Sequence, residues 1–260
     1  MPKIGEIYQE QCKICKDFDV LSADLRLLIA HNEGYPGQID VLFHKEDEMK
    51  DPMLFLSQVE RLKKGKPIEY IIGEAQFLGM NLYVDKNVLI PRNETEELVA
   101  ILSQKISEYF DPRNYLMVGD IGTGSGAIVL GIKSLFPNWV CAACDISKKA
   151  AAVAKKNFDR YGLNLEVDIS DALDTYIKNN TKFDILISNP PYIVQKSDAQ
   201  QSVRDYEPGS ALWLTPENDV YEKIFANVYK VKRGALFMAF EISPDLVDHL
   251  NGLMDKYLHD

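Results

Sequence analysis

From residue 94 onward, apolar segments of strand length alternate with helical patterns, and this alternation limits what the chain can fold into. Apolar runs typical of buried strands lie near 116–121, 139–144, 163–168, 183–188 and 234–241. Helical patterns lie near 94–110, 125–136, 147–161, 219–232 and 244–258. Because strands that are connected through helices usually run parallel, we predict an α/β fold, a parallel sheet with helices on both faces.

The chain before this alternation has a different pattern. Residues 3 to about 64 have helical patterns, in which Ser22 could cap one helix and Asp51-Pro52 should begin another that ends before Gly65. Residues 74–84 alternate like a β-hairpin with its tip near 79–81. We therefore expect three parts: a helical domain at 1–72, a β-hairpin linker at 73–92 and an α/β domain at 93–260.

The tetrapeptide Asn189-Pro190-Pro191-Tyr192 directly follows the apolar run 183–188, so a buried strand should deliver it to a cleft. Its two prolines fix φ and supply no N–H, which leaves rigidly held carbonyl oxygens beside the Asn189 amide. Such a loop can accept hydrogen bonds from a planar –NH2 group, and Tyr192 could stack on that group. The segment therefore predicts a site for an amide or an exocyclic amine.

A glycine turn, Gly122-Thr123-Gly124-Ser125-Gly126, joins the run 116–121 to a helical pattern. Glycines there let the backbone approach a ligand at a helix N-terminus. Their spacing differs from the Gly-x-Gly-x-x-Gly that fits a dinucleotide pyrophosphate, which argues against NAD. Asp145 ends the next strand, where a carboxylate can accept hydrogen bonds from ribose hydroxyls.

Together, Asp120 to Gly126, Asp145 and the 189–192 tetrapeptide resemble the signatures of S-adenosylmethionine-dependent methyltransferases that methylate a planar nitrogen. Other segments resemble more narrowly the HemK/PrmC family, the peptide chain release factor glutamine methyltransferases. These segments are 65–73, 77–79, 89–96, Glu207-Pro208, Ala211-Leu212 and Glu241-Ile242. The resemblance covers roughly residues 20 to 245.

This resemblance implies a Rossmann-like methyltransferase domain behind a small helical domain. It implies transfer of a methyl group from S-adenosylmethionine to the side-chain amide nitrogen of a glutamine in a release factor, and so a role in translation termination. The residues that it places at the cofactor are Asp120, Gly122, Thr123, Gly124, Ser125, Gly126, Asp145, Ile146, Asp171, Ala172 and Asn189. The residues that it places in catalysis are Asn189, Pro190, Pro191 and Tyr192.

Individual roles follow from the chemistry of these groups. The Asn189 side-chain oxygen and the Pro190 carbonyl would accept the two N–H bonds of the glutamine amide, and positioning would then replace a strong general base. Asp145 would hold the ribose, Asp120 would face the methionine ammonium group, and Asp171 would reach the adenine amine. At a strand end, an aspartate can instead be only a helix cap or a turn residue.

The chain departs from the family pattern at three points. Asn93 stands where the family usually has proline, and Ala172 stands where a bulkier side chain often covers the adenine. The chain also stops at Asp260, soon after a helical segment. We therefore expect the final β-hairpin of the family's sheet to be absent.

Charge and hydropathy narrow the class of protein. The chain carries 29 basic and 39 acidic residues, a net charge of −10, which suits neither phosphate-backbone tracking nor direct sequence-specific binding of nucleic acid. Its densest basic patch is 61–66. No apolar run approaches 18 residues and the N-terminus lacks a secretory segment, so we expect a cytoplasmic protein without a membrane span. We expect a monomer whose helical domain and acidic surface bind the release factor.

The four cysteines form two pairs, Cys12-x-x-Cys15 and Cys141-x-x-Cys144, on a predicted helix and in a predicted strand. The histidines, at 31, 44, 249 and 259, have no ligand spacing, so we expect no metal site. Two other functions stay open. A DNA or RNA adenine amine methyltransferase shares the Asn-Pro-Pro-Tyr loop but should carry a basic cleft. A non-catalytic cofactor-binding subunit would not need Asn189 and Tyr192.

Overall fold

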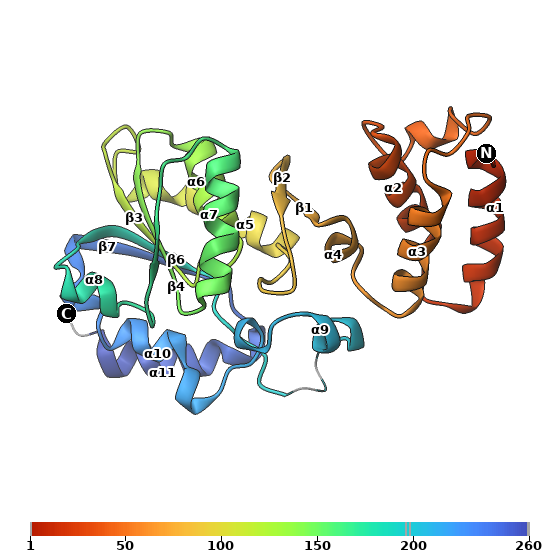
Figure 1. Ribbon diagram of the computed structural model, residues 1–260. Helices are drawn as coiled ribbons and strands as arrows, with labels where there is room; N and C mark the ends of the chain where they lie inside the picture. Colours follow the sequence, from red (N-terminus) through yellow and green to blue (C-terminus); the bar gives the residue numbers. More distant parts are fainter. Residues whose placement is uncertain (1, 196, 198, 259–260) are drawn as a thin grey trace. The chain divides into compact units, whose positions relative to one another are not determined.

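The computed structural model describes residues 2–195, 197 and 199–258, and the chain forms two compact units. The first unit contains Met1–Gly73 together with Gln201–Tyr206. The second contains Glu74–Gln200 and Glu207–Asp260. Figure 1 shows the helices of the first unit and the sheet of the second. Each unit has its own buried core.

The first unit is helical, with α1 (Ile4–Ile14), α2 (Ser22–Glu33), α3 (Pro52–Lys63), α4 (Ile68–Ile72) and α9 (Gln201–Tyr206). The predicted cap of α3 is confirmed, since the Asp51 side chain accepts a hydrogen bond from the Leu54 N–H at 2.9 Å. The predicted cap of α2 is wrong. Leu21 is the N-cap and its N–H donates to Asp24 Oδ2 at 3.1 Å, so Ser22 is already helical.

The second unit contains the parallel sheet that the alternation predicts. Its strands are β3 (Met117–Ile121), β4 (Val140–Asp145), β5 (Val167–Ile169), β6 (Phe183–Ser188) and β7 (Lys232–Phe240), in the order β5-β4-β3-β6-β7. Each neighbouring pair is parallel. β5 is shorter than the predicted 163–168, because the Leu163 N–H bonds back to Phe158 of the preceding helix.

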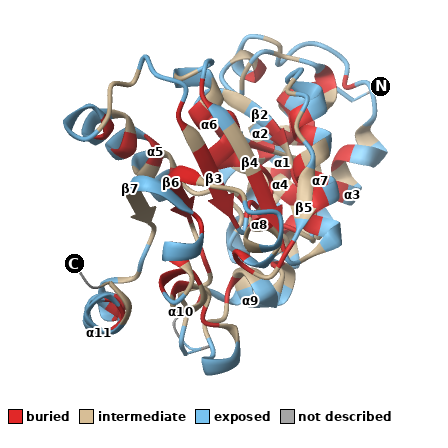
Figure 2. Cartoon of the chain, turned by 90° about the vertical axis from the view of Figure 1, so that its left-hand side faces the viewer, coloured by how far each residue is buried: buried red, intermediate tan, exposed pale blue. Residues whose placement is uncertain are grey.

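Helices cover both faces of this sheet (Figures 1 and 2). One face packs against α5 (Asn93–Lys105), α6 (Ala127–Leu135) and α7 (Lys148–Arg160). The other packs against α8 (Asp174–Lys178) and α10 (Val220–Phe225), and α11 (Val247–Tyr257) lies beside α10. The predicted helix 219–232 is in fact α10 followed by a separate 3-10 turn at Val228–Lys230. The short α8, α4 and α9 were not predicted.

A hairpin of β1 (Glu74–Phe77) and β2 (Met80–Tyr83) begins the second unit. Its tip is Leu78-Gly79 and not the predicted 79–81, and both residues have positive φ, as a tight hairpin turn requires. Asn157 of α7 holds the hairpin, because it donates to the Tyr83 carbonyl at 2.9 Å and accepts from the Tyr83 N–H at 2.7 Å. The structure thus groups the hairpin with the sheet, whereas we expected a separate linker.

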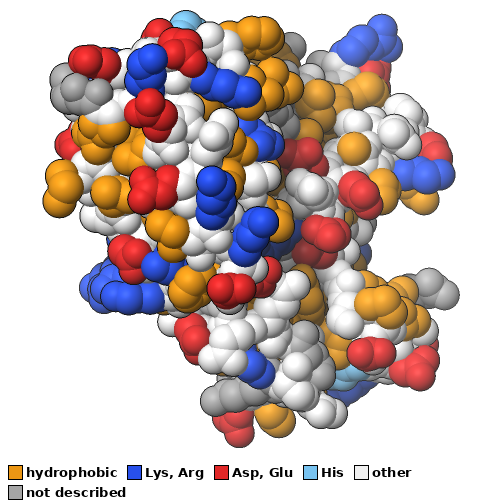
Figure 3. Space-filling view, turned by 90° about the vertical axis from the view of Figure 1, so that its right-hand side faces the viewer, with side chains coloured by type: hydrophobic (Ala, Val, Ile, Leu, Met, Phe, Trp, Pro, Cys, Tyr) orange, Lys and Arg blue, Asp and Glu red, His pale blue; other side chains and the backbone are white. Residues whose placement is uncertain are grey.

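The surface mixes side chains of both charges. Figure 3 shows, on one face, Lys and Arg side chains interspersed with Asp, Glu and hydrophobic groups. None of the helices formed by the described residues has the length and apolar character needed to cross a membrane.

Candidate functional site

A cavity, partly open to solvent, lies at the carboxyl ends of β3, β4 and β6. The chain runs from β3 outward to β5 on one side and from β6 to β7 on the other, so the strand order reverses between β3 and β6. Ligands of open α/β sheets bind in the crevice at such a switch point. We call the turn 122–126 with Asp145 the glycine wall, and Thr95 with residues 189–191 the amide wall. Gly126 belongs to the turn but is not among the described residues that line the cavity.

Backbone hydrogen bonds build the glycine wall. The N–H groups of Gly122 and Thr123 both donate to the Cys144 carbonyl, each at 2.9 Å, which ties the turn to the end of β4. Gly126 has a φ of 82° and is the N-cap of α6. A Cβ on Gly126 would lie 2.6 Å from Cε1 of the fully buried Phe158, so both conformation and space require glycine there.

Asp145 is held where the sequence predicts an acceptor. Its Oδ2 accepts from the Gly124 N–H at 3.0 Å and its Oδ1 from the Ser147 N–H at 2.8 Å. Burial raises the pKa of Asp145, and the two backbone hydrogen bonds oppose that rise. The residue lines the cavity with only 9% of its surface exposed. Each carboxylate oxygen keeps a lone pair, so the group can accept from a ligand diol.

Asp120 lies behind the turn, fully buried, and is not among the described residues that line the cavity. Its Oδ2 accepts from the Thr123 hydroxyl at 2.6 Å, whereas its Oδ1 has no hydrogen-bond partner among the described residues. Burial, with a smaller contribution from the charge of Asp145, raises the pKa of Asp120 to about 7. The structure thus places this carboxylate one layer behind the position that the sequence suggested.

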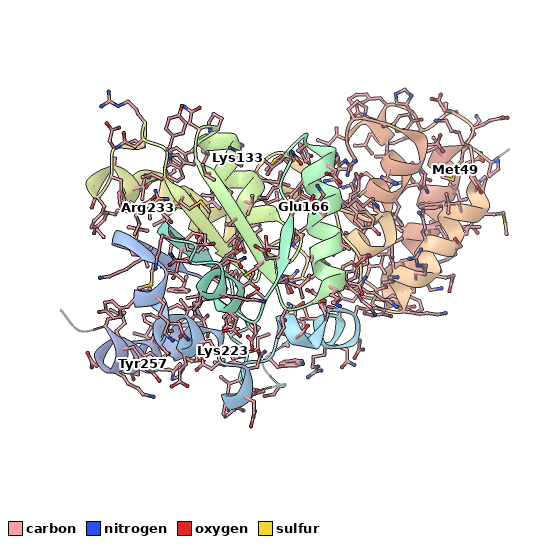
Figure 4. All side chains as sticks on the ribbon, turned by 60° about the vertical axis from the view of Figure 1, so that its left-hand side comes forward. Met49, Lys133, Glu166, Lys223, Arg233 and Tyr257 are labelled. Atoms are coloured by element: carbon pink, nitrogen blue, oxygen red, sulfur yellow. The ribbon has the colours of Figure 1, made fainter. Side chains whose placement is uncertain are left out.

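Asp171 and Ala172 both line the cavity, but Asp171 is already paired. Lys223 of α10, labelled in Figure 4, donates to Oδ1 at 2.9 Å and to Oδ2 at 2.7 Å of Asp171. Any ligand amine at Asp171 would share the carboxylate with this lysine. Ala172 has a φ of 44°, which side-chain-bearing residues rarely adopt, and its methyl group makes a small, apolar wall.

The amide wall is joined to the glycine wall by Ser188, the last residue of β6. Its hydroxyl donates to the carbonyl of Ile121, the last residue of β3, so Asn189 and Gly122 leave adjacent strands side by side. The Asn189 Nδ2 donates to Thr95 Oγ1 at 3.0 Å, and that hydroxyl donates to Glu241 Oε2 at 2.7 Å. Asn189, Pro190 and Pro191 all line the cavity.

Tyr192 is placed differently from our prediction. It is not among the described residues that line the cavity and packs instead against buried side chains of α10 and α11. Burial raises the pKa of Tyr192 most, and its contact with the Glu241 carboxylate raises it further. The ring therefore supports the loop from behind, and its stacking on a planar group stays a prediction.

Several described residues that line the cavity were not predicted as site residues. They come from the segment before α5, from the ends of β4 and β5, and from the loop before α10: Asn87, Val88, Leu89, Pro91, Thr95, Ser147, Ser170, Ser210, Ala211, Asn218 and Val220. The family-like segments 89–96 and Ala211-Leu212 were the available signal. The buried Glu207 accepts a hydrogen bond from Arg92, which ties two of these segments together.

The cysteines do not form a metal centre with other ligands. Within the part of the chain that the structure describes, no group of three or more His, Cys, Asp or Glu side chains could hold a metal ion, and His259 lies outside that part. The four cysteines are free thiols. Burial raises the pKa of the Cys144 thiol to about 12, which fits a small apolar residue in β4.

Comparisons with known proteins agree with this geometry. The family Methyltransferase small domain matches residues 98–217. A release factor glutamine methyltransferase of Bacillus subtilis is 39% identical over 202 residues, which are 76% of this chain and 68% of that protein. One from Clostridium acetobutylicum is 34% identical over 258 residues, 96% of this chain and 84% of that protein.

A solved structure supports the fold. The hMettl16 catalytic domain, crystallised in complex with an RNA hairpin of a 3′UTR, superposes with a TM-score of 0.53 over 80% of this chain and 75% of that one. The two sequences are 14% identical, so this likeness concerns the fold alone. It confirms the predicted α/β methyltransferase fold.

Proposed function

The chain belongs to the release factor glutamine methyltransferase family, and on this basis we propose that it methylates the side-chain amide nitrogen of a glutamine in a release factor. The methyl donor that we propose is S-adenosylmethionine. The observation that carries the proposal is the Ser188–Ile121 hydrogen bond, which holds the glycine wall and the amide wall on adjacent strands.

The residues of the glycine wall fit S-adenosylmethionine. The Asp145 carboxylate would accept the ribose hydroxyls, and Ile146 and Ala172 would border the adenine. The buried Asp120, whose Oδ1 has no hydrogen-bond partner among the described residues, would face the methionine ammonium group from behind the turn, and a bound ammonium group would favour its ionised form. When bound, this cofactor supplies a methyl group on a positively charged sulfur, which is a strong electrophile.

The amide wall would present the acceptor. An amide nitrogen is a poor nucleophile because its lone pair is delocalised, so the protein must hold it in line with the methyl–sulfur bond. We propose that Asn189 Oδ1 and the Pro190 carbonyl accept the two N–H bonds of the glutamine. Orientation of this kind can lower a barrier by about 7–11 kcal/mol. Positioning would therefore supply most of the lowering of the reaction barrier.

Proton removal needs no strong base. The methylated amide nitrogen is acidic enough to lose its proton to water. The Thr95 hydroxyl accepts a hydrogen bond from Asn189 and donates one to the Glu241 carboxylate. It would position Asn189 and would not act as a nucleophile. Asn189, and not a base, is then the side chain on which transfer depends.

We propose further that the protein acts as a monomer and that its first unit recognises the body of the release factor. Large apolar side chains are exposed there, among them Phe43 at 80%, Met53 at 75% and Ile39 at 65%. Such groups favour a protein partner, and the net charge of −10 disfavours a phosphate backbone. Phe43→Ser and Met53→Ser should raise the Michaelis constant for the intact factor while leaving a glutamine-containing peptide unaffected.

The function is tested by incubating the protein with labelled S-adenosylmethionine and a release factor, followed by peptide mass spectrometry. We expect one methyl group on the side chain of a single glutamine, and none when that glutamine is replaced by alanine. Transfer to adenine of an RNA or DNA duplex, with no transfer to the factor, would overturn the proposal in favour of a nucleic-acid methyltransferase.

A further inference from the structure

A hydrogen-bond network holds the Asn189 amide, and one member of it follows the C-terminal end of β7. Glu241 follows β7 directly, and Thr95 lies in the first turn of α5 with 4% of its surface exposed. The Glu241 carboxylate accepts from the Thr95 hydroxyl at 2.7 Å and also interacts with the Asn189 amide and the Tyr192 hydroxyl. Side chains from α5 and from the loop after β6 therefore meet at this one carboxylate.

The donors and acceptors in this network leave Thr95 one arrangement. An ionised carboxylate can only accept hydrogen bonds, and a threonine hydroxyl has a single hydrogen. Because Thr95 gives that hydrogen to Glu241, it can only accept from Asn189. The end of the Asn189 amide that faces Thr95 must therefore be its NH2 group, and the structure has Nδ2 at this end, 3.0 Å from Thr95 Oγ1.

This arrangement decides which atom of Asn189 is left for a substrate. With Nδ2 turned to Thr95, the oxygen Oδ1 is the end of this cavity-lining amide that has no hydrogen-bond partner among the described residues. A reversed amide would present N–H donors to the N–H donors of a substrate amide, which cannot form a hydrogen bond. The two orientations of Asn189 have almost the same shape, so packing alone discriminates poorly between them.

We propose that Thr95 and Glu241 are positioning residues that set the direction of the Asn189 amide, so that its oxygen and not its nitrogen meets the substrate –NH2 group. This inference rests on the proposed function and deepens it. Thr95 and Glu241 act through Asn189 and take no part in the chemistry. Tyr192 adds a second hydrogen-bond donor to the same carboxylate and so helps to keep it in place.

The test compares Thr95→Val with Thr95→Ser. Valine keeps the shape of threonine but removes the hydroxyl, whereas serine keeps the hydroxyl and removes a methyl group. We expect Thr95→Val to lower kcat about ten- to a hundredfold, as expected when a buried polar partner is lost, and Thr95→Ser to stay within about threefold of the parent. The dissociation constant for S-adenosylmethionine should change by less than about threefold in both variants.

A matched control lies on the same helix. Ser103→Ala removes an exposed hydroxyl of α5 that donates only to the Ala100 carbonyl, and it should leave kcat unchanged. Should Thr95→Val fail to fold, as judged by its thermal midpoint, Glu241→Gln is the second variant. Its amide can donate as well as accept, so Asn189 loses its fixed direction and kcat should fall while the Michaelis constants stay the same.

Three results would overturn the inference. They are an unchanged kcat in Thr95→Val or in Glu241→Gln, a Thr95→Ser variant as impaired as Thr95→Val, or a loss that appears in cofactor affinity and not in kcat. Methylation of the release factor by the unsubstituted protein in the same assay separates these results from failure of the proposed function. If that protein is inactive on the factor, the function fails; if it is active and the variants match it, only the orientation network fails.

Discussion

The two walls of the cavity are built from different materials. The glycine wall uses backbone N–H groups, positive φ angles and buried carboxylates, with Gly122 and Thr123 bonded to the end of β4. The amide wall uses side chains, in a chain of hydrogen bonds from Asn189 to Thr95 to Glu241. A backbone wall is fixed once the strands pair, whereas a side-chain wall depends on each donor and acceptor in it.

This difference implies a division of labour. Changes in the glycine wall should alter folding or cofactor affinity, and changes in the amide wall should alter the rate of transfer at saturating cofactor. A variant of one wall that changes the property assigned to the other would contradict this division.

The largest effect is expected from Asn189→Ala. Removing the acceptor oxygen should lower kcat about a hundred- to a thousandfold, the usual loss when one preorganised transition-state contact is removed. The dissociation constant for S-adenosylmethionine, measured by calorimetry, should change little. A kcat within about tenfold of the parent would mean that this side chain does not position the amide.

Gly126→Ala should act on the opposite wall and on stability. Its new Cβ would meet the buried Phe158 ring, whereas Gly162→Ala carries a similar positive φ with nothing within 4 Å of the new atom. We expect Gly126→Ala to be less stable than Gly162→Ala by about 1–3 kcal/mol, the usual range for overpacking. Chemical denaturation of both variants measures the difference. Equal stabilities would show that the Phe158 ring moves aside at little cost.

Asp145→Asn should weaken cofactor binding without slowing transfer at saturation. Hydrogen bonds to a charged group contribute about 1.5–3 kcal/mol, so the dissociation constant should rise about ten- to a hundredfold. Calorimetric titration with S-adenosylmethionine checks this. An unchanged constant would leave Asp145 as a structural cap for the Gly124 and Ser147 N–H groups.

A dependence of stability on pH is expected from Asp120. Burial raises the pKa of this carboxyl from 3.8 to about 7 in the folded protein. Between these two values the folded state holds a proton that the unfolded state has lost, so stability should fall as pH rises from about 4 to about 7 and level off above that. Asp120→Asn should flatten this slope, because it removes the group that titrates over that range. The free energy of unfolding of both proteins, measured by denaturation at each pH, checks this. The same dependence on pH in the two proteins would contradict the assignment.

The sequence predicts the glycine wall better than the amide wall, for physical reasons. Gly126, Asp145 and the strand ends are neighbours along the chain or at fixed spacings, so local pattern is enough to place them. Thr95 and Glu241 are 146 residues apart and meet only because α5 packs on the sheet beside β7. Their role depends on tertiary packing and on the group to which the Thr95 hydroxyl donates. A local sequence motif predicts neither of these.

Burial explains the other differences. Asp120 and Tyr192 were expected at the ligand, and both lie behind the residues that line the cavity. A pattern of residue types shows which loop reaches the site but not which side of that loop faces it. For Asp171, the competing partner is Lys223, 52 residues further along the chain, and its approach follows from the packing of α10.

The most direct test of the account is a crystal structure of the protein with S-adenosylhomocysteine and a release-factor peptide that contains the glutamine. We predict that the glutamine side-chain nitrogen lies within hydrogen-bonding distance of both Asn189 Oδ1 and the Pro190 carbonyl, with Asn189 Nδ2 still bonded to Thr95. A glutamine whose carbonyl oxygen faces Asn189 Nδ2, or one bound away from residues 189–191, would contradict it.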